Sequence, residues 1–185
     1  MAAEQWNIDP AHSGAYFVVR HMVVSKVRGA FTRWNGTLTV DEERPENSRV
    51  EVHIDAASVD TRDPKRDAHL RSADFFDVER FPEVTFRSTR VASRGRDRLQ
   101  VIGDLTIHGV THSVTLDVDV LGRGKDPWGG ERAGFSAKTA IHRGDFGLLW
   151  NQALETGGVL VGEKVEIELE VEAVKAEQPA AAAKK

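Results

Sequence analysis

An uninterrupted alternation of apolar and charged residues near the end of the chain limits the fold most strongly. Apolar residues occupy the odd positions from Val165 to Val171, and glutamates occupy the even positions from Glu166 to Glu172. A helix would spread these two kinds of residue around its circumference, whereas a strand places them on opposite faces. The segment is therefore predicted to be a β-strand with one dry face and one wet face.

The same period of two recurs upstream, between segments rich in turn-forming residues. It predicts about eight strands, mostly antiparallel neighbours because their connections are short. The residues on the dry faces are Trp6 and Ile8; Ala15, Phe17 and Val19; Val27, Gly29 and Phe31; Trp34, Leu38 and Val40; Val50, Val52 and Ile54; Val84 and Phe86; Leu99, Val101, Gly103, Leu105 and Ile107; Val114, Leu116, Val118 and Val120; Ala133, Phe135, Ala137, Thr139 and Ile141.

Two segments depart from this pattern. Asp63 is a good helix N-cap and Pro64 suits the first helical position, so a short helix is predicted over 64–71, with a second turn over 72–76. The Ala- and Lys-rich segment 176–185 is predicted to be a disordered tail after a single domain over 1–175.

Composition excludes several classes of protein. The 185 residues include no cysteine, which rules out disulfides, thiolate metal sites and cysteine nucleophiles. A net charge of −4 gives no indication of nucleic-acid binding. Neither a stretch of about 18 apolar residues nor a secretory leader occurs, so we expect no integral membrane segment and a cytoplasmic location.

A chain of this pattern folds as a sandwich or as a barrel, and a barrel removes the unpaired edges that the long final strand would otherwise present. Eight strands enclose room for side chains or for one small ligand. Small residues at Gly29, Gly103, Ala133 and Ala137 leave space unless Phe17, Phe31, Phe86 and Phe135 cover them. The interior is thus either a packed core or an apolar tunnel.

Several motifs follow one another over about residues 5–174. In chain order they are Trp6-Asn7-Ile8-Asp9-Pro10-Ala11-His12-Ser13, Val19-Arg20-His21-Met22, Gly29-Ala30-Phe31, Gly36-Thr37-Leu38, the run from Arg66 to Asp77, the run from Phe81 to Thr89, the run from Gly103 to Thr111, and Arg143-Gly144-Asp145-Phe146-Gly147-Leu148. Together these motifs resemble the YceI-like family of bacterial polyisoprenoid-binding proteins.

The resemblance implies an all-β, antiparallel, eight-stranded, lipocalin-like barrel with one or two short helices and a long apolar tunnel. It further implies binding, sequestration or carriage of an amphiphilic isoprenoid, such as a prenyl diphosphate or an isoprenoid quinone, by a homodimer that is not an enzyme and needs no cofactor. Many members are periplasmic, whereas this sequence shows no leader.

Residues predicted to contact such a ligand lie on the dry faces and in the segment after residue 143. They are Phe17, Val19, Phe31, Phe86, Leu105, Ile107, Leu116, Val118, Phe135, Ala137, Ile141, Phe146 and Leu148. Apolar residues of the irregular segments either plug one barrel end or form the lip of a mouth; these are Phe75, Phe76, Phe81, Phe146, Leu148, Leu149 and Trp150.

A charged head group would need donors at the mouth. Arg20, His21 and Arg143 are the candidates, together with the basic pair at 65–66, because guanidinium groups bind diphosphates in a bidentate manner. The structural alternative is that Arg143 pairs with Asp145, and that Arg20 and His21 only shape the turn after their strand.

Two other functions stay open. In the first, His108 and His112 flank a tight turn and would hold a metal with His53 or His12, giving an isomerase or hydrolase at the barrel mouth, although no second shell is evident. In the second, the barrel is fully packed and serves as a stress-linked interaction protein.

Overall fold

One antiparallel sheet of eleven strand segments accounts for most of the structure, a computed structural model that describes residues 3–177. The predicted tail lies almost entirely outside the described residues. The strands are β1 (Glu4–Ile8), β2 (Gly14–His21), β3 (Ser25–Phe31), β4 (Trp34–Val40), β5 (Arg49–Asp55), β6 (Val59–Asp60), β7 (Glu83–Gly95), β8 (Arg98–Ile107), β9 (Val110–Lys125), β10 (Glu131–His142) and β11 (Val161–Lys175).

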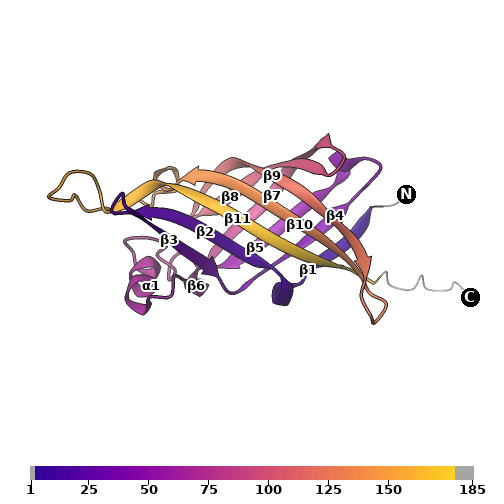
Figure 1. The fold of residues 1–185 in the computed structure, drawn as a ribbon, viewed down its shortest axis with the longest axis horizontal. Coiled ribbons are helices and arrows are strands. Elements are labelled where there is room, and N and C mark those ends of the chain that lie inside the picture. The colour runs from indigo at the N-terminus through magenta and orange to yellow at the C-terminus, as the bar shows by residue number, and fades with distance from the viewer. Residues whose placement is uncertain (1–2, 178–185) are drawn as a thin grey trace, which may run out of the picture.

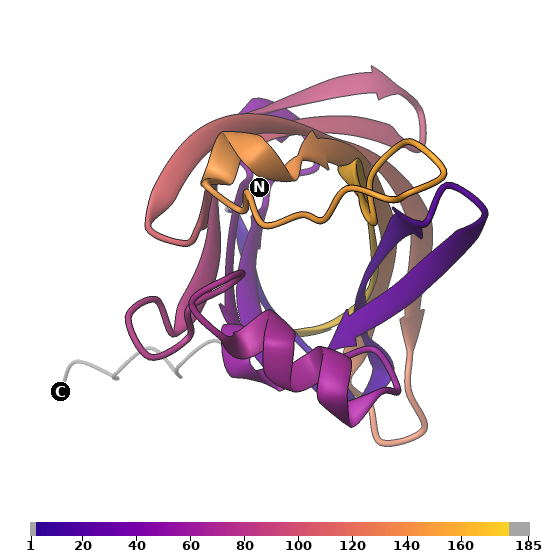
Figure 2. The ribbon, with the colours of Figure 1, turned by 90° about the vertical axis from the view of Figure 1, so that its left-hand side faces the viewer.

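The sheet closes on itself through the final strand. On one edge β11 pairs with β10, and on the other edge its last residues, Ala173 to Lys175, pair with β1. Because β1 also pairs with β4, eight strands form a ring in the order β1-β4-β5-β7-β8-β9-β10-β11 (Figures 1 and 2). The predicted eight-stranded antiparallel barrel is confirmed.

The hairpin of β2 and β3 extends the wall beyond the point where β1 ends. β2 pairs with the first part of β11, from Val161 to Glu170, and β6 adds to the outer edge of β3. Between them, β1 and β2 therefore cover one long edge of β11 in succession. Figure 1 places the β2–β3 turn and α1 (Pro64–Arg71) at the left end of the barrel, opposite both termini.

The helix α1 confirms the prediction made from Asp63 and Pro64. The Asp63 carboxylate accepts hydrogen bonds from the backbone N–H groups of Lys65 and Arg66, and Pro64 takes the first helical position. At the other end of α1, Arg71 donates to the backbone carbonyls of Ala57 and Val59. The second predicted turn at 72–76 forms a series of hydrogen-bonded turns.

Glycines on the inner face are covered by aromatic rings. A Cβ added to Gly29 would overlap the ring of Phe17, its partner across β2 and β3. A Cβ added to Gly103 would lie 2.5 Å from Cζ of Phe86. These rings lie flat along the wall, so the space that the two glycines leave is already filled.

None of the helices within residues 3–177 combines the length and the hydropathy that crossing a bilayer requires.

Candidate functional site

A cavity of about 670 Å³ runs along the inside of the barrel. Its lining residues extend from Val40 and Arg49 near the seam with β1 to Lys65, His69 and Trp150 at the α1 end. The 15 residues of β11 extend about 50 Å at 3.3 Å per residue, which a barrel tilt of 35–45° shortens to roughly 35–40 Å along the axis. The cavity volume lies within the range of about 300–1,000 Å³ found for small-molecule pockets.

The period of two explains why the wall is apolar. Each strand of the ring turns its dry face inward, so side chains from distant parts of the chain meet around one lumen. The sequence-predicted contact residues that line the cavity are Phe17, Val19, Phe31, Phe86, Leu105, Ile107, Leu116, Val118, Phe135, Ala137, Ile141 and Leu148. Their contact with a ligand stays a prediction.

Phe146 does not reach the cavity, contrary to the placement predicted for it. It lies in the 3-10 turn η4 (Arg143–Phe146), is 1% exposed, and packs edge-on against His112 with 5.2 Å between ring centroids. Phe146 packs in the buried core on the same side of β9 as the lumen, because His112 shares the register of Val114 and Leu116, while Leu148 two residues later lines the lumen itself.

Several lining residues were not nominated from the sequence, although the same alternation marks them. Among those on strands are Trp34, Leu38, Val52, Ile54, Val84, Val101, Val165, Ile167, Leu169 and Val171. Leu70 of α1 was missed for a different reason, because an eight-residue helix shows too little periodicity to indicate which side faces the barrel.

Aromatic side chains meet at the α1 end of the cavity. The ring centroids of His69 and Trp150 are 4.6 Å apart, those of Phe75 and Trp150 are 5.4 Å apart, and Phe76 contacts Phe31 at 5.6 Å. All of these residues line the cavity. The two irregular segments therefore meet across this end and form its lip.

Two residues of these segments lie elsewhere. Phe81 packs against His108 with 4.8 Å between centroids, and Leu149 is exposed to solvent.

Arg143 is a structural residue rather than a free donor. Its guanidinium is buried and donates to the backbone carbonyls of Leu148 (2.6 Å), Trp150 (2.9 Å) and Gly162 (2.9 Å). Burial lowers the pKa of Arg143 below its ordinary value, because the charged form loses solvation. Arg143 is among the residues that line the cavity, but backbone carbonyls take up its guanidinium, so the geometry supports neither the predicted head-group role nor the alternative pairing with Asp145.

The remaining basic candidates stay at the α1 end. Arg20, His21, Lys65 and Arg66 all line the cavity, and Arg66 is engaged by the hydroxyl and carbonyl oxygens of Thr61 at 2.8 and 2.9 Å. Within residues 3–177, Arg20 and Lys65 make no ion pair with an acidic side chain, which leaves both available to an anion.

The histidines that suggested a metal site have separate partners. His112 Nε2 lies 2.8 Å from the carbonyl oxygen of Asp145, and His108 packs edge-on against Phe81. His53 bridges Glu51 and Glu83 at 2.9 and 2.8 Å, and these two carboxylates, Glu51 first, raise its pKa. Among the residues that the structure describes, these separate partners give no support to the alternative in which the histidines converge on one metal.

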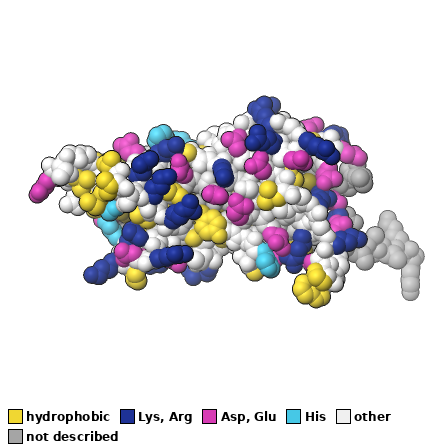
Figure 3. Space-filling model, in the orientation of Figure 1, with side chains coloured by type: hydrophobic (Ala, Val, Ile, Leu, Met, Phe, Trp, Pro, Cys, Tyr) yellow, Lys and Arg dark blue, Asp and Glu magenta, His cyan; other side chains and the backbone are white. Residues whose placement is uncertain are grey.

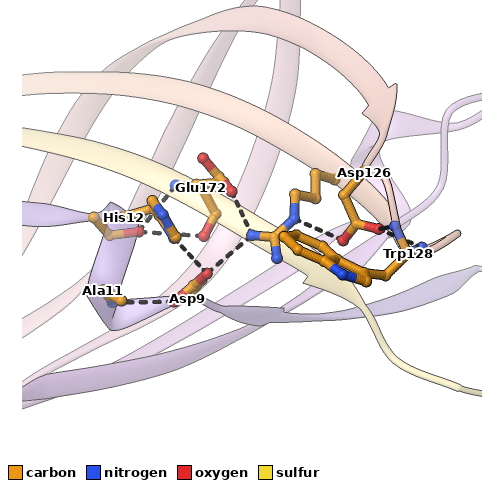
Figure 4. Close-up of polar contacts among 9 residues, drawn as sticks. Asp9, Ala11, His12, Asp126, Trp128 and Glu172 are labelled. Carbon is orange, nitrogen blue, oxygen red and sulfur yellow. Dashed lines mark hydrogen bonds and ion pairs between the residues drawn. The ribbon is translucent and has the colours of Figure 1, made fainter.

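One group of potential metal ligands does form in residues 3–177, from Asp9, His12 and Glu172. Figure 4 shows that a guanidinium already lies among them: Arg132 donates to Asp9 (2.9 Å), to Glu172 and to Asp126 (3.0 Å). The guanidinium supplies the positive charge that a metal would bring. The cluster links β1, β10 and β11 where the barrel closes.

The sequence profile of the YceI-like domain family matches residues 6–173. Protein YceI of Salmonella newport is 44% identical over 148 residues, which are 79% of this chain and 77% of that protein. A UPF0312 protein of Vibrio parahaemolyticus is 42% identical over 138 residues, covering 75% and 73%.

Solved structures share the fold. The YceI protein of Campylobacter jejuni superposes with a TM-score of 0.74 at 30% identity, over 85% of this chain and 90% of that one. BcnA of Burkholderia cenocepacia gives a TM-score of 0.79 at 26% identity, over 89% and 98%. A polyisoprenoid binding domain from Saccharophagus degradans shares the fold with a TM-score of 0.67 at 16% identity, over 92% and 98%.

Proposed function

Because the chain belongs to the YceI-like domain family, we propose that it binds an amphiphilic isoprenoid lipid, and sequesters or carries it in the barrel. The observation that carries the proposal is the apolar cavity of about 670 Å³ along the barrel axis. The Saccharophagus domain of the same fold, described as polyisoprenoid-binding, adds support.

The driving force of such binding would be burial of the prenyl chain. Removal of apolar surface from water is worth about 25 cal/mol per Å², or about 0.8 kcal/mol per buried CH₂. Several isoprene units would outweigh the cost of ordering a flexible chain. An apolar wall distinguishes length and shape better than chemistry, so we propose that the lumen selects a chain length.

The polar end of the ligand would lie at the α1 end. Lys65, Arg20 and His21 line the cavity there, whereas Arg49 at the other end is engaged with the carbonyl oxygens of Glu46 and Ser48. The positive charges of Lys65 and Arg20 favour an anionic head such as the diphosphate of a prenyl diphosphate. An isoprenoid quinone, whose head is neutral, is the second kind of ligand within the proposed class of amphiphilic isoprenoids.

The experiment is extraction of the purified full chain with organic solvent, followed by mass spectrometry. We expect an isoprenoid in the extract, or stoichiometric uptake of added farnesyl or geranylgeranyl diphosphate or of a quinone. Substitution of Lys65 by Gln should weaken uptake of the diphosphates and leave the quinone unaffected. An empty extract without uptake of either class would overturn the proposal.

Carriage rather than turnover is part of the proposal, and the separate partners of His108 and His112 support it. Metal analysis and the variants His108→Ala and His112→Ala test the enzymatic alternative: bound metal whose loss follows these substitutions would favour it. The proposed homodimer is tested by sedimentation equilibrium.

A further inference from the structure

Exposed apolar side chains gather at the α1 end of the barrel. We define the end patch as Met22, Val23 and Val24 of the β2–β3 turn with Leu149 and Val159 of the segment before β11. Val24 is 86% exposed and Leu149 is 73% exposed. Figure 3 shows yellow side chains at the left end of the molecule, where the turn and this segment lie. Contiguous apolar surface of this kind marks an interaction site more often than scattered single residues do.

The two segments of the end patch are joined by backbone contacts. The Met22 N–H donates to the carbonyl of Leu160 at 2.8 Å, and His21 pairs with Val161 in the ladder. A Cβ on Gly158 would lie 3.6 Å from Cγ2 of Val23. These contacts join the turn to residues 158–161, and this part of the end patch borders the cavity because His21, Leu160 and Val161 line the lumen.

The turn holds its apolar residues at a conformational cost. Met22 and Val23 have φ angles of 52° and 65°, a region that glycine and asparagine occupy easily and a β-branched residue rarely does. Solubility and turn geometry would both favour other residues there. Strain that persists at an exposed apolar tip is typical of a site under functional constraint.

A row of cations lies directly behind the end patch. Arg20 and Lys26 face each other across β2 and β3 on the outer side of the hairpin, and Arg28 follows on the same face. Like charges opposite each other destabilise a ladder, and none of the three forms an ion pair within residues 3–177. Dark blue side chains appear to the right of the yellow ones in Figure 3, with magenta acidic side chains among them. In the adjoining segment 147–164 the acidic residues are Glu155 and Glu163, and further along β11 Glu166 pairs with Val18, the partner of Arg28.

From this arrangement we propose that the end patch docks on an anionic lipid bilayer, inserting its apolar turn among the acyl chains while Lys26 and Arg28 meet the lipid phosphates. Each basic residue near an anionic surface adds about fivefold to the affinity. A second copy of the chain fits the end patch less well than a bilayer does, because a two-fold interface would bring the basic residues of the two copies close to each other. This proposal rests on the proposed lipid-binding function, because its purpose would be to let the ligand pass between bilayer and lumen at this end.

Vesicle flotation tests the proposal with the full chain. We expect binding to vesicles of phosphatidylethanolamine with phosphatidylglycerol, weakened by salt, and little binding to phosphatidylcholine alone. The double variant Val24→Ser/Leu149→Ser should lower the binding constant at least tenfold. The variant Lys26→Glu/Arg28→Glu should do the same on anionic vesicles only. A matched control, Leu121→Ser/Trp128→Ser, removes equally exposed apolar residues from outside the end patch and should bind as the parent does.

Three results would overturn the docking proposal: no flotation of the parent chain, equal loss in the Leu121/Trp128 control, or conversion of a dimer to a monomer by Val24→Ser/Leu149→Ser in sedimentation equilibrium. None of the residues changed in the two docking variants, Val24, Leu149, Lys26 and Arg28, lines the cavity. Extraction of each variant therefore reports separately on lipid carriage: retained isoprenoid with lost flotation supports docking alone, and flotation with an empty extract leaves docking standing and carriage overturned.

Discussion

The indole of Trp150 packs edge-on against the imidazole of His69, with 4.6 Å between ring centroids. The contact joins the segment before β11 to α1 across one end of the cavity, and Phe75 completes it. His69 is in turn held by Asp74, 2.8 Å from its Nε2. A ligand that enters or leaves the lumen at this end would pass these rings.

Trp150→Ala should therefore speed ligand release. Loss of the two ring contacts removes part of the barrier, and we expect a roughly tenfold faster release, equivalent to about 1.4 kcal/mol. Stopped-flow exchange of a fluorescent prenyl analogue measures it. Trp128→Ala, which removes an exposed indole from the β9–β10 turn, is the control, and an equal effect of the two changes would contradict a gate at Trp150.

Ala137→Trp should block the lumen. Ala137 lines the cavity between its ladder partners Val118 on β9 and Leu169 on β11, so an indole there would occupy ligand space. We expect uptake to fall while the barrel persists, at a stability cost of about 1–3 kcal/mol from overpacking. Circular dichroism and uptake are measured together. Ala140→Trp, on the exposed outer face of the same strand, should leave uptake unchanged.

Gly29→Ala should disturb the wall through Phe17. The added methyl group would overlap the Phe17 ring and push it toward the lumen, at a cost of about 1–3 kcal/mol. The double variant Gly29→Ala/Phe17→Leu should recover part of that loss, since the shorter side chain vacates the space. Urea unfolding of the four members of the cycle gives the coupling free energy, and strict additivity would show that ring and glycine are independent.

Val23→Gly should stabilise the protein. Glycine adopts the φ of 65° without the steric cost that valine has, so the free energy of unfolding should rise by about 1 kcal/mol. Val24→Gly is the matched control. Val24 lacks a positive φ, so glycine there would only make the unfolded chain more flexible, and the free energy of unfolding should not rise. Urea midpoints compare the two.

Arg132→Gln should weaken the acid dependence of stability. Arg132 is the leading cause that holds the pKa of Asp126 below its ordinary value of 3.8, whereas the pKa of Asp9 is lowered first by His12 and then by Arg132. A carboxylate with a lowered folded-state pKa stabilises the fold above about pH 4, and that contribution disappears as pH falls through the folded-state pKa.

Without the guanidinium, both pKa values should return toward their ordinary range. The variant should then be less stable at neutral pH, and its stability should fall less steeply between pH 4 and pH 2. Urea unfolding across this range tests the slope. Arg96→Gln, which removes an exposed arginine from the β7–β8 turn, should reproduce the parent slope.

Much of this architecture was determined locally along the chain. The alternation from Val165 to Val171 requires a strand with an apolar inner face, because a period of two leaves no other way to separate its side chains. The Asp63–Pro64 pair sets the start of α1, because capping depends on neighbouring residues only. Closure by the last strand followed from its length and the cost of an open edge.

Only the tertiary structure decided that the barrel is hollow and where its polar groups point. The lumen is open because Phe17 and Phe86 lie flat over Gly29 and Gly103 instead of crossing it, a matter of side-chain packing between strands far apart in sequence. Arg143, a head-group candidate from the sequence, is buried and donates to backbone carbonyls because the segment before β11 folds back over it. The volume of the cavity and the directions of the side chains inside it depend on many non-local contacts at once. An alternating sequence pattern determines neither of them.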